Sequence, residues 1–438
     1  MQKLSSSVIA NPWFILLLLF LINTANFYDR LIISAIGEPI RKEFDLSDTS
    51  LGLLSTAFVL LYALVGVPLG RLADKYSRKR LLSIGVFVWS FLTLISGFAR
   101  SFGQLFFFRL GVGVGEATCA PAATSLISDI FPAEKRARAM SIFMLGLPIG
   151  IALSFLVSGA ITAAYGWRYA FFVAGVPGII LSFLILLIRE PERPPLARDE
   201  RTRLAFWQSI LNVLRPVTMR WLVISGVLHN FCLYALSAFM TPYLMRFHGL
   251  EIKEATLLAM LVNGVFTLPG LLLGGIAGDA ARKWRKNGGL LVVAAASLLS
   301  APLFIAAVLS EKGNTVVFLW TMGLAFALMY FYYSITYAAI ADITPPENRA
   351  TAMAVYFFAM YFLGGALGPY VVGILSDHFT RRTAILQGIV EDSSVALEPF
   401  RGYGLQDAML VVPVLCVILS GIMLMAARAM RPADQKGS

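Results

Sequence analysis

The stretch DIFPAEKRARAM, at positions 129–140, returns as DITPPENRATAM at positions 342–353. Eight of the twelve aligned positions are identical, and each stretch directly follows an apolar run. A weaker pair is GRLADKYSRKR at 70–80 and GIAGDAARKWRK at 275–286. Self-similarity over such a distance is typical of a chain built from two copies of one helical bundle. We therefore predict two similar halves.

Apolar runs long enough to cross a membrane surround these repeats. The chain is 58% hydrophobic and 14% charged, with a mean hydropathy of +0.76, whereas about a quarter of an ordinary soluble domain is charged. About 20 apolar residues cross a bilayer as a helix, because its hydrocarbon core is about 30 Å thick. We predict an all-α membrane protein with twelve transmembrane helices in two pseudo-symmetric six-helix bundles. The expected spans are 11–34, 49–72, 81–100, 104–130, 139–163, 168–189, 221–247, 254–278, 290–310, 314–343, 350–377 and 408–430.

The basic residues indicate the topology. Most of the 36 lysines and arginines fall in alternate connections between spans, with dense groups at 71–80, 189–220 and 282–286. Loops rich in Lys and Arg stay in the cytoplasm, so both termini are predicted to be cytoplasmic. The net charge of +11 then reflects topology, and no nucleic-acid partner is expected. A basic patch could also bind anionic lipid headgroups.

The chain is expected to divide at its longest cytoplasmic connection. That connection is charged and begins with the proline-rich REPERPP at 189–195. We predict an N-terminal six-helix bundle at 1–189, a cytoplasmic linker at 190–220 and a C-terminal six-helix bundle at 221–438.

Several function classes are excluded by what the sequence lacks. The chain has no GxxxxGK[ST] motif, which argues against an ATP-driven pump. Its three cysteines lie within apolar runs and its three histidines are far apart, so neither a disulfide framework nor a metal site is predicted. No nucleophile–base set stands at recognisable spacing. We expect no enzyme activity, no catalytic residue and no cofactor.

Four charged residues of the first half stand within the predicted spans and away from their ends: Asp29, Arg30, Arg109 and Glu116. Each costs about 2.5–3.5 kcal/mol at the centre of a membrane helix. Arg109 and Glu116 are seven residues apart, which places them on one helix face. The two positive and two negative charges can therefore neutralise one another, and intramembrane charge is by default a sign of function.

The motifs together resemble those of the major facilitator superfamily. The loop at 70–80 matches that family's pattern at Gly70, Asp74, Arg78 and Lys79, with Ser77 where the family usually has glycine. RLGVGVGEA at 109–117 resembles the family's fourth-span motif, and REPERP at 189–194 resembles the motif that ends span six. Within the superfamily, NFYDR, RLGVGVGEATCAP and SLISDIFP resemble the Spinster family, and the short loops are similar to those of its bacterial members.

This resemblance implies a secondary transporter that works by alternating access in a bacterial inner membrane, and a monomer. Animal Spinster proteins are associated with the export of sphingosine-1-phosphate or lysophospholipids. The resemblance also implies that spans one and four of each half line the cavity. In the second half, many of the polar side chains within the spans are tyrosines, and the first half carries the buried charges. We therefore expect a substrate with a charged head and an apolar tail, an amphipathic anionic lipid.

We interpret the charged cluster as a proton-coupled switch. Burial raises the pKa of a carboxyl group and a nearby arginine lowers it, so a carboxylate that changes partner links proton binding to conformation. Proton coupling is assigned to Asp29, Arg30, Arg109 and Glu116. Arg30 could also hold an anionic headgroup, because guanidinium suits phosphate and carboxylate. The expected substrate contacts are Asn26, Tyr28, Arg30, Glu116, His229, Asn230, Tyr330, Tyr337 and Tyr356. The alternative is a static, neutral cluster that joins spans one and four.

The loop residues are expected to form a conformational lock. The resemblance implies that Gly70, Asp74, Arg78 and Lys79 stabilise the outward-open state. Asp279 stands in the weaker second copy of this loop and is expected to have the same role in the second half. The alternative is the ordinary positive charge of a cytoplasmic loop.

Other functions remain compatible with the same spans. A proton-coupled symporter of small organic anions, or a drug exporter of the same superfamily, is the first alternative. A receptor or scaffold would leave the duplicated bundle and the buried charges without a role. Export by antiport and uptake by symport use similar parts, and both stay open.

Overall fold

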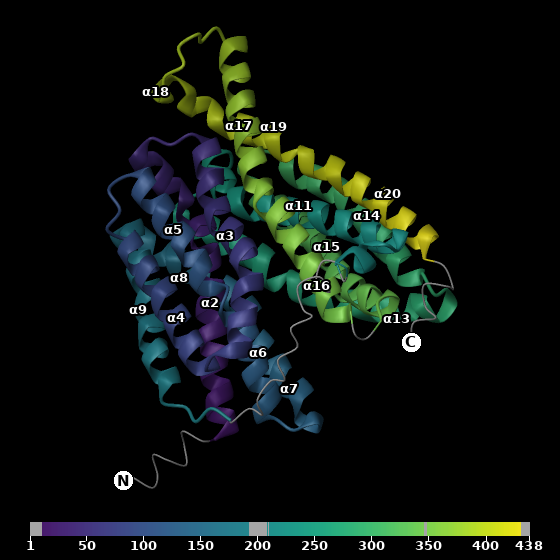
Figure 1. Cartoon of the computed structure of the whole chain (residues 1–438). Helices are drawn as coiled ribbons and strands as arrows, with labels where there is room; N and C mark the ends of the chain where they lie inside the picture. The colour runs from purple at the N-terminus through teal and green to yellow at the C-terminus, as the bar shows by residue number, and fades with distance from the viewer. Residues whose placement is uncertain (1–10, 192–207, 209, 346–347, 431–438) are drawn as a thin grey trace. The chain divides into compact units, whose positions relative to one another are not determined.

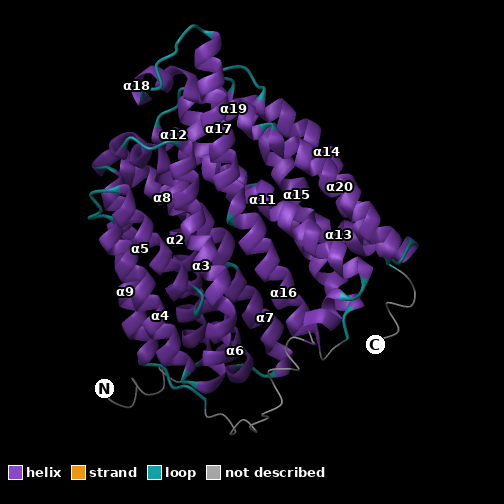
Figure 2. Cartoon of the chain, turned by 45° about the horizontal axis from the view of Figure 1, so that its top comes forward, coloured by secondary structure: helices purple, strands orange, loops and turns teal. Residues whose placement is uncertain are grey.

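The computed structural model describes residues 11–191, 208, 210–345 and 348–430, except for the side chains of 63, 66–75, 133, 137 and 350. Every regular element in these described residues is helical (Figure 2), which confirms the all-α prediction. Eleven helical stretches are long and apolar enough to cross a membrane. The helix α3, Asp48–Lys75, occupies the place of the remaining predicted span.

The chain folds into two compact units (Figure 1). The first unit comprises 1–46, 53–195 and 251–260, and the second comprises 47–52, 196–250 and 261–438. The first turn of α3 therefore belongs to the second unit, and a short stretch of the eighth span belongs to the first. The predicted linker at 190–220 lies largely outside the described residues.

The first unit is built from paired long helices. α4 packs along α9, and α2 packs along α8. Besides the larger part of α3, the unit contains α2 (Pro12–Phe44), α4 (Arg78–Ser96), α5 (Phe102–Glu116), α6 (Cys119–Ile130), α7 (Ala133–Met144), α8 (Gly146–Tyr165), α9 (Trp167–Leu186) and α12 (Ile252–Met260).

The second unit holds the remaining helices. α14 packs against α15 and α20, and α17 packs against α19. Its helices are α11 (Val217–Arg246), α13 (Thr267–Trp284), α14 (Gly288–Val308), α15 (Thr315–Ile343), α16 (Arg349–Ala359), α17 (Leu367–Leu386), α18 (Ser394–Leu397), α19 (Arg401–Met409) and α20 (Val411–Ala429).

The first helix ends ten residues later than the sequence predicted. The prediction ended at residue 34, before the charges of Glu38 and Arg41, but α2 continues to Phe44. Glu38 and Arg41 stand one turn apart and form a buried ion pair of 2.9 Å. Because the two charges neutralise each other within one turn, the helix can continue through them.

Two spans of the second unit contain a wide π-helical turn. Leu261–Val265 joins α12 to α13, and Met360–Gly365 joins α16 to α17. In each turn a backbone N–H donates to a carbonyl five residues earlier, over 3.0 Å from Phe266 and 2.9 Å from Ala366. A proline lies four residues beyond each turn, at 269 and 369. Proline cannot donate to the carbonyl four residues before it and crowds that carbonyl, which favours a local distortion.

Candidate functional site

The four predicted intramembrane charges lie together in the first unit. α2 supplies Asp29 and Arg30, and α5 supplies Arg109 and Glu116. None of the four residues is more than 9% exposed. Asp29 and Arg30 are consecutive, so their side chains leave the helix about 100° apart. They therefore have different partners.

Asp29 is fully engaged by hydrogen-bond donors. Arg109 donates from Nη1 to Asp29 Oδ1 over 2.7 Å and from Nη2 to the Asp29 carbonyl oxygen over 2.9 Å. The hydroxyl of Thr93, on α4, donates to the other carboxylate oxygen. Thr93 is a contact that the sequence analysis missed, because a lone threonine in an apolar span carries no distinctive signal.

Glu116 is held much more loosely. Its Oε2 lies 3.5 Å from Arg30 Nη2, and its Oε1 is buried with no hydrogen-bond partner among the described residues. The same Arg30 nitrogen lies 3.4 Å from Asn26 Oδ1. Three aromatic rings surround the Arg30 guanidinium, with centroids at 4.7 Å for Phe27, 5.1 Å for Phe58 and 4.5 Å for Tyr62.

Tyr28 points to a different neighbour. Its hydroxyl lies 2.9 Å from Ser158 Oγ on α8. It therefore links two helices of the first unit, and Arg30 is not its hydrogen-bond partner.

In the second unit, His229 and Asn230 contact the backbone of neighbouring spans. His229 Nε2 lies 2.9 Å from the carbonyl oxygen of Met329, and its ring stacks on Tyr332 at 4.0 Å. Asn230 donates to the carbonyl oxygen of Met360 over 3.1 Å, at the start of the second π-helical turn. These contacts tie α11 to its neighbours, and substrate binding by the two residues stays a prediction.

The predicted tyrosines form one aromatic cluster. Tyr356 is buried and donates to the hydroxyl of Tyr332 over 2.9 Å. Tyr330 and Tyr337 are partly exposed, and their ring centroids lie 5.3 and 5.7 Å from that of Tyr333. Of the predicted tyrosines in this unit, Tyr330 and Tyr337 are thus the two that a ligand could reach most readily.

The repeated aspartate at the head of each DI-x-P stretch has the same kind of partner in both units. Asp129 accepts from Arg78, and Asp342 lies 3.1 Å from Arg282. Arg78 is the first residue of α4, and Arg282 lies in the last turn of α13. The repeat that indicates the duplicated fold thus also marks a duplicated ion pair.

Arg78 has a second carboxylate partner in Glu190, over 2.9 Å. Ser77 donates to the other oxygen of Glu190. Burial raises the pKa of Glu190, but the hydrogen bonds from Ser77 and Arg78 outweigh it and hold that pKa below its usual range. Ser77 has φ −57°, so this position needs no glycine.

The other residues of the predicted conformational lock have different surroundings. Lys79 donates to the carbonyl oxygens of Leu186 and Ile188 over 3.3 and 2.9 Å. Asp279 is exposed. Gly70 and Asp74 lie in α3, and their side chains are outside the described residues. The conformational lock therefore stays a prediction.

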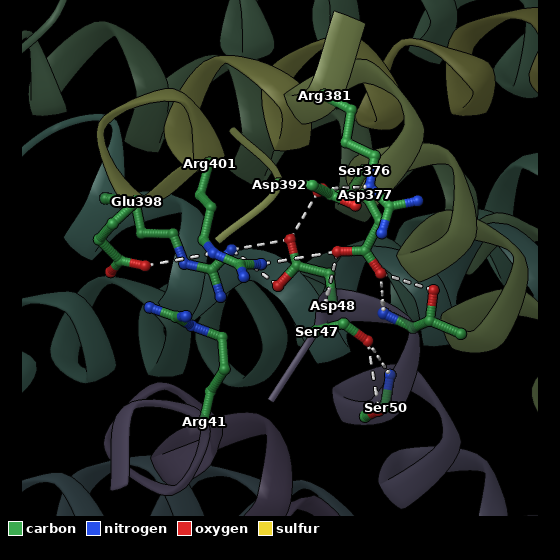
Figure 3. A network of polar contacts seen from close by, with 12 residues as sticks. Arg41, Ser47, Asp48, Ser50, Ser376, Asp377, Arg381, Asp392, Glu398 and Arg401 are labelled. Carbon is green, nitrogen blue, oxygen red and sulfur yellow. Dashed lines mark hydrogen bonds and ion pairs between the residues drawn. The ribbon is translucent and has the colours of Figure 1, made fainter. Parts of the chain in front are cut away.

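A polar network in the second unit was not anticipated from the sequence (Figure 3). Asp48, at the start of α3, accepts from Arg246 Nη1 over 2.8 and 2.9 Å and from Ser376 over 2.6 Å. Asp377 accepts from the backbone N–H groups of Asp48 and Thr49 over 2.9 and 2.8 Å. A carboxylate at a helix N-terminus is favourable, because the N–H groups there have no partner within the helix. The sequence offered two signals, Arg246 and Asp377, which stand at the ends of the predicted seventh and eleventh spans.

Metal ligation finds no support in this geometry. Among the described residues, no group of three or more His, Cys, Asp or Glu side chains is placed to hold a metal ion. The site consists of paired charges, amides and aromatic rings.

Comparisons with known proteins agree with this architecture. Residues 15–369 match the family model of the Major Facilitator Superfamily. An MFS-type efflux pump of Mycolicibacterium smegmatis is 30% identical, over 84% of this chain and 85% of that protein. The sphingosine-1-phosphate transporter SPNS2 of Xenopus tropicalis is 28% identical, over 82% of this chain and 73% of that protein. The crystal structure of a bacterial homologue of the human lysosomal transporter Spinster superposes with a TM-score of 0.84, at 28% identity, over 97% of this chain and 98% of that one.

Proposed function

Because this chain belongs to the Major Facilitator Superfamily of membrane transporters, we propose that it moves an amphipathic anionic lipid, such as a lysophospholipid or a sphingosine-1-phosphate-like molecule, by proton-coupled alternating access. The protein acts as a monomer in a bacterial inner membrane, with both termini in the cytoplasm. Its matched relatives are transporters and not enzymes.

The observation that carries the proposal is the unequal environment of the two buried carboxyl groups. Asp29 accepts from two side chains, Arg109 and Thr93, so its negative charge is compensated. Glu116 has one oxygen without a hydrogen-bond partner among the described residues and one long contact to Arg30. A buried charge without good partners is unfavourable and promotes proton binding. Glu116 is therefore our proton-carrying group.

Arg30 couples that proton to the substrate. Its guanidinium faces Glu116 and is enclosed by aromatic rings, an environment that suits a phosphate or carboxylate headgroup. A substrate anion that binds Arg30 competes with Glu116 for the same positive charge. Loss of that charge favours the protonated form of Glu116, so substrate and proton binding become linked.

The second unit contains an aromatic cluster that suits an apolar ligand. Tyr330 and Tyr337 are partly exposed members of an aromatic cluster, and aromatic side chains offer large apolar surfaces. The name of the Xenopus relative supports a lipid phosphate as cargo. The name of the mycobacterial relative, an MFS-type efflux pump, supports an exporter of another cargo as the alternative.

The test is substrate-dependent proton flux in liposomes that contain a trapped pH dye. We expect a lysophospholipid or sphingoid phosphate to drive flux in the parent protein, and Glu116→Gln to abolish it. Glu43→Gln is the matched control, because Glu43 is a half-exposed carboxylate of α2 paired with Arg168, and it should keep the flux.

Three results would count against the proposal. Undiminished flux in Glu116→Gln would make the cluster structural. Lipid movement without proton flux would make the protein a facilitator. Flux with small organic acids or drugs but not with lipids would favour the alternative transporter classes.

A further inference from the structure

α13 has one face packed against protein and one face exposed. At Gly274 an added Cβ would lie 2.5 Å from the Cα of Phe331 on α15, so that face is in close contact with its neighbour. Leu272, Leu273 and Ile276 are 69%, 55% and 67% exposed. In a membrane-spanning helix, an exposed apolar face is the one that meets lipid. α13 therefore carries a lipid-facing surface along its first half.

The same helix ends with an exposed tryptophan. Trp284 is the last residue of α13 and is 92% exposed. Its ring makes no stacking contact and its indole N–H no hydrogen bond among the described residues. Tryptophan is enriched at the boundary between the hydrocarbon of a bilayer and its headgroups, and Trp284 lies about two helical turns beyond Ile276 on the same helix.

Four cations accompany Trp284, at positions 282, 283, 285 and 286. Arg282 is paired with Asp342. Lys283, Arg285 and Lys286 are exposed and have no ion pair within the described part of the chain. The exposed Asp279 lies one turn before Lys283, and its single negative charge does not cancel the positive charge of the segment. We call Lys283, Trp284, Arg285 and Lys286 the α13 basic turn.

The α13 basic turn is held in place by the fold. Arg285 N–H donates to the carbonyl oxygen of Ala281 over 3.0 Å, and Gly288 N–H donates to that of Arg285 over 2.8 Å. The side chain of Asn287 donates to the carbonyl oxygen of Ala427 over 2.9 Å. The cations therefore project from an ordered turn, which lowers the entropy lost when they bind a partner.

In the corresponding turn of the first unit, two of the cations have partners within that unit. There Arg78 meets two carboxylates, Asp129 and Glu190, and Lys79 meets two backbone carbonyl groups. In the second unit Asp342 pairs with Arg282, and the three following cations have no carboxylate partner among the described residues. Arg78 thus has two carboxylate partners, whereas the three exposed cations of the second unit are available to an external anion.

We propose that the α13 basic turn binds the headgroup of an anionic phospholipid of the surrounding bilayer. Lys283, Arg285 and Lys286 contact the phosphate, and Trp284 lies at the boundary between headgroup and acyl chains. Clusters of Lys and Arg at the end of a spanning helix attract anionic lipids in this way. The site is separate from the Arg30–Glu116 cluster and depends on the membrane location of the chain, not on its cargo or on proton coupling.

The experiment measures quenching of tryptophan fluorescence by brominated lipids in nanodiscs. Brominated phosphatidylglycerol is compared with brominated phosphatidylcholine at equal mole fraction, and Trp284→Phe isolates the contribution of Trp284 among the seven tryptophans. We expect phosphatidylglycerol to quench Trp284 at least twofold more strongly at low salt. The preference should shrink as salt rises, because exposed charges are screened.

The triple variant Lys283→Gln, Arg285→Gln, Lys286→Gln should abolish this preference. A matched triple, Arg80→Gln, Lys135→Gln, Arg136→Gln, removes three exposed cations of the first unit and should retain it. Melting temperatures would establish that both variants fold. Equal quenching by the two lipids in the parent protein would overturn the proposal, as would an equal loss in both triple variants, which would indicate only general surface charge.

Discussion

Asp29 and Glu116 are similarly buried, but we expect them to contribute very differently to the stability of the fold. Asp29 neutralises Arg109, which is 1% exposed, whereas Glu116 makes one long contact. Loss of one partner of a buried ion pair costs about 3–5 kcal/mol, because the other charge stays buried and unpaired. We expect Asp29→Asn to lower the free energy of unfolding by about that much, and Glu116→Gln to leave it nearly unchanged.

Melting temperatures of the purified variants in detergent would check this contrast. Thr93→Val provides a graded comparison, since it removes one donor to Asp29 and should cost about 1–3 kcal/mol. Equal melting temperatures for Asp29→Asn and Glu116→Gln would show that the ion pair of Asp29 contributes no more to stability than the contact of Glu116.

His248 should make the stability of the protein depend on pH. It follows α11 and packs against Tyr243 and Phe318, and its Nδ1 accepts from Gly313 N–H over 3.2 Å. Burial lowers the pKa of His248 below its ordinary 6.5. The unfolded chain therefore binds a proton first as the pH falls below about 6.5, and folding stability is lost from there down to the folded-state pKa.

We expect melting temperatures recorded between pH 8 and pH 5 to fall below about pH 6.5 in the parent. His248→Asn keeps a side-chain acceptor but does not titrate, so its curve should be flatter in that window. Parallel curves for the two proteins would mean that other groups control the acid loss.

The π-helical turns connect sequence to helix geometry. Pro269 has no N–H to donate to the carbonyl oxygen of Val265, and Pro369 has none for that of Gly365. We expect Pro269→Ala to restore a donor and to slow amide hydrogen exchange at 265–270 by about tenfold, which corresponds to ~1.4 kcal/mol of local opening free energy.

Hydrogen exchange followed by mass spectrometry measures this effect. Pro369→Ala is the counterpart in the eleventh span and should act on the equivalent amides at 365–370. Faster exchange at 265–270 in Pro269→Ala would show that proline stabilises the wide turn instead of causing it.

For the molecule as a whole, the division into units runs through α3. Residues 47–52 belong to the second unit and the helix then continues in the first. Asp48 and Arg246 form an ion pair of 2.8 Å with side chains 0% and 6% exposed. We expect Asp48→Asn to cost about 3–5 kcal/mol of stability and to speed hydrogen exchange at 47–52.

Asp392→Asn is the control, because its pair with Arg381 is about 60% exposed on both sides. Such a surface pair contributes about 0–1 kcal/mol. If the two variants unfold at the same temperature, the buried network does not anchor the start of α3.

Much of the architecture follows from local properties of the chain. Hydropathy indicated the spans and the repeat at 129–140 and 342–353 indicated the duplication, because helix formation in a membrane depends on each segment's own composition and length. Intramembrane charge singled out Asp29, Arg30, Arg109 and Glu116, since such residues are rare at that depth. Their assembly in one unit was expected, and their roles in proton coupling remain predictions.

The sequence by itself thus determined the all-helical membrane class, the duplicated plan and the small set of charges that a membrane tolerates only in pairs. Only the tertiary structure decided the pairing: Arg109 with Asp29 and not with Glu116 on its own helix, Arg78 with Asp129 and Glu190, and Asp377 with the start of α3. The physical reason is that hydropathy and periodicity act within one helix, whereas a hydrogen bond depends on the rotation and depth of two helices packed together.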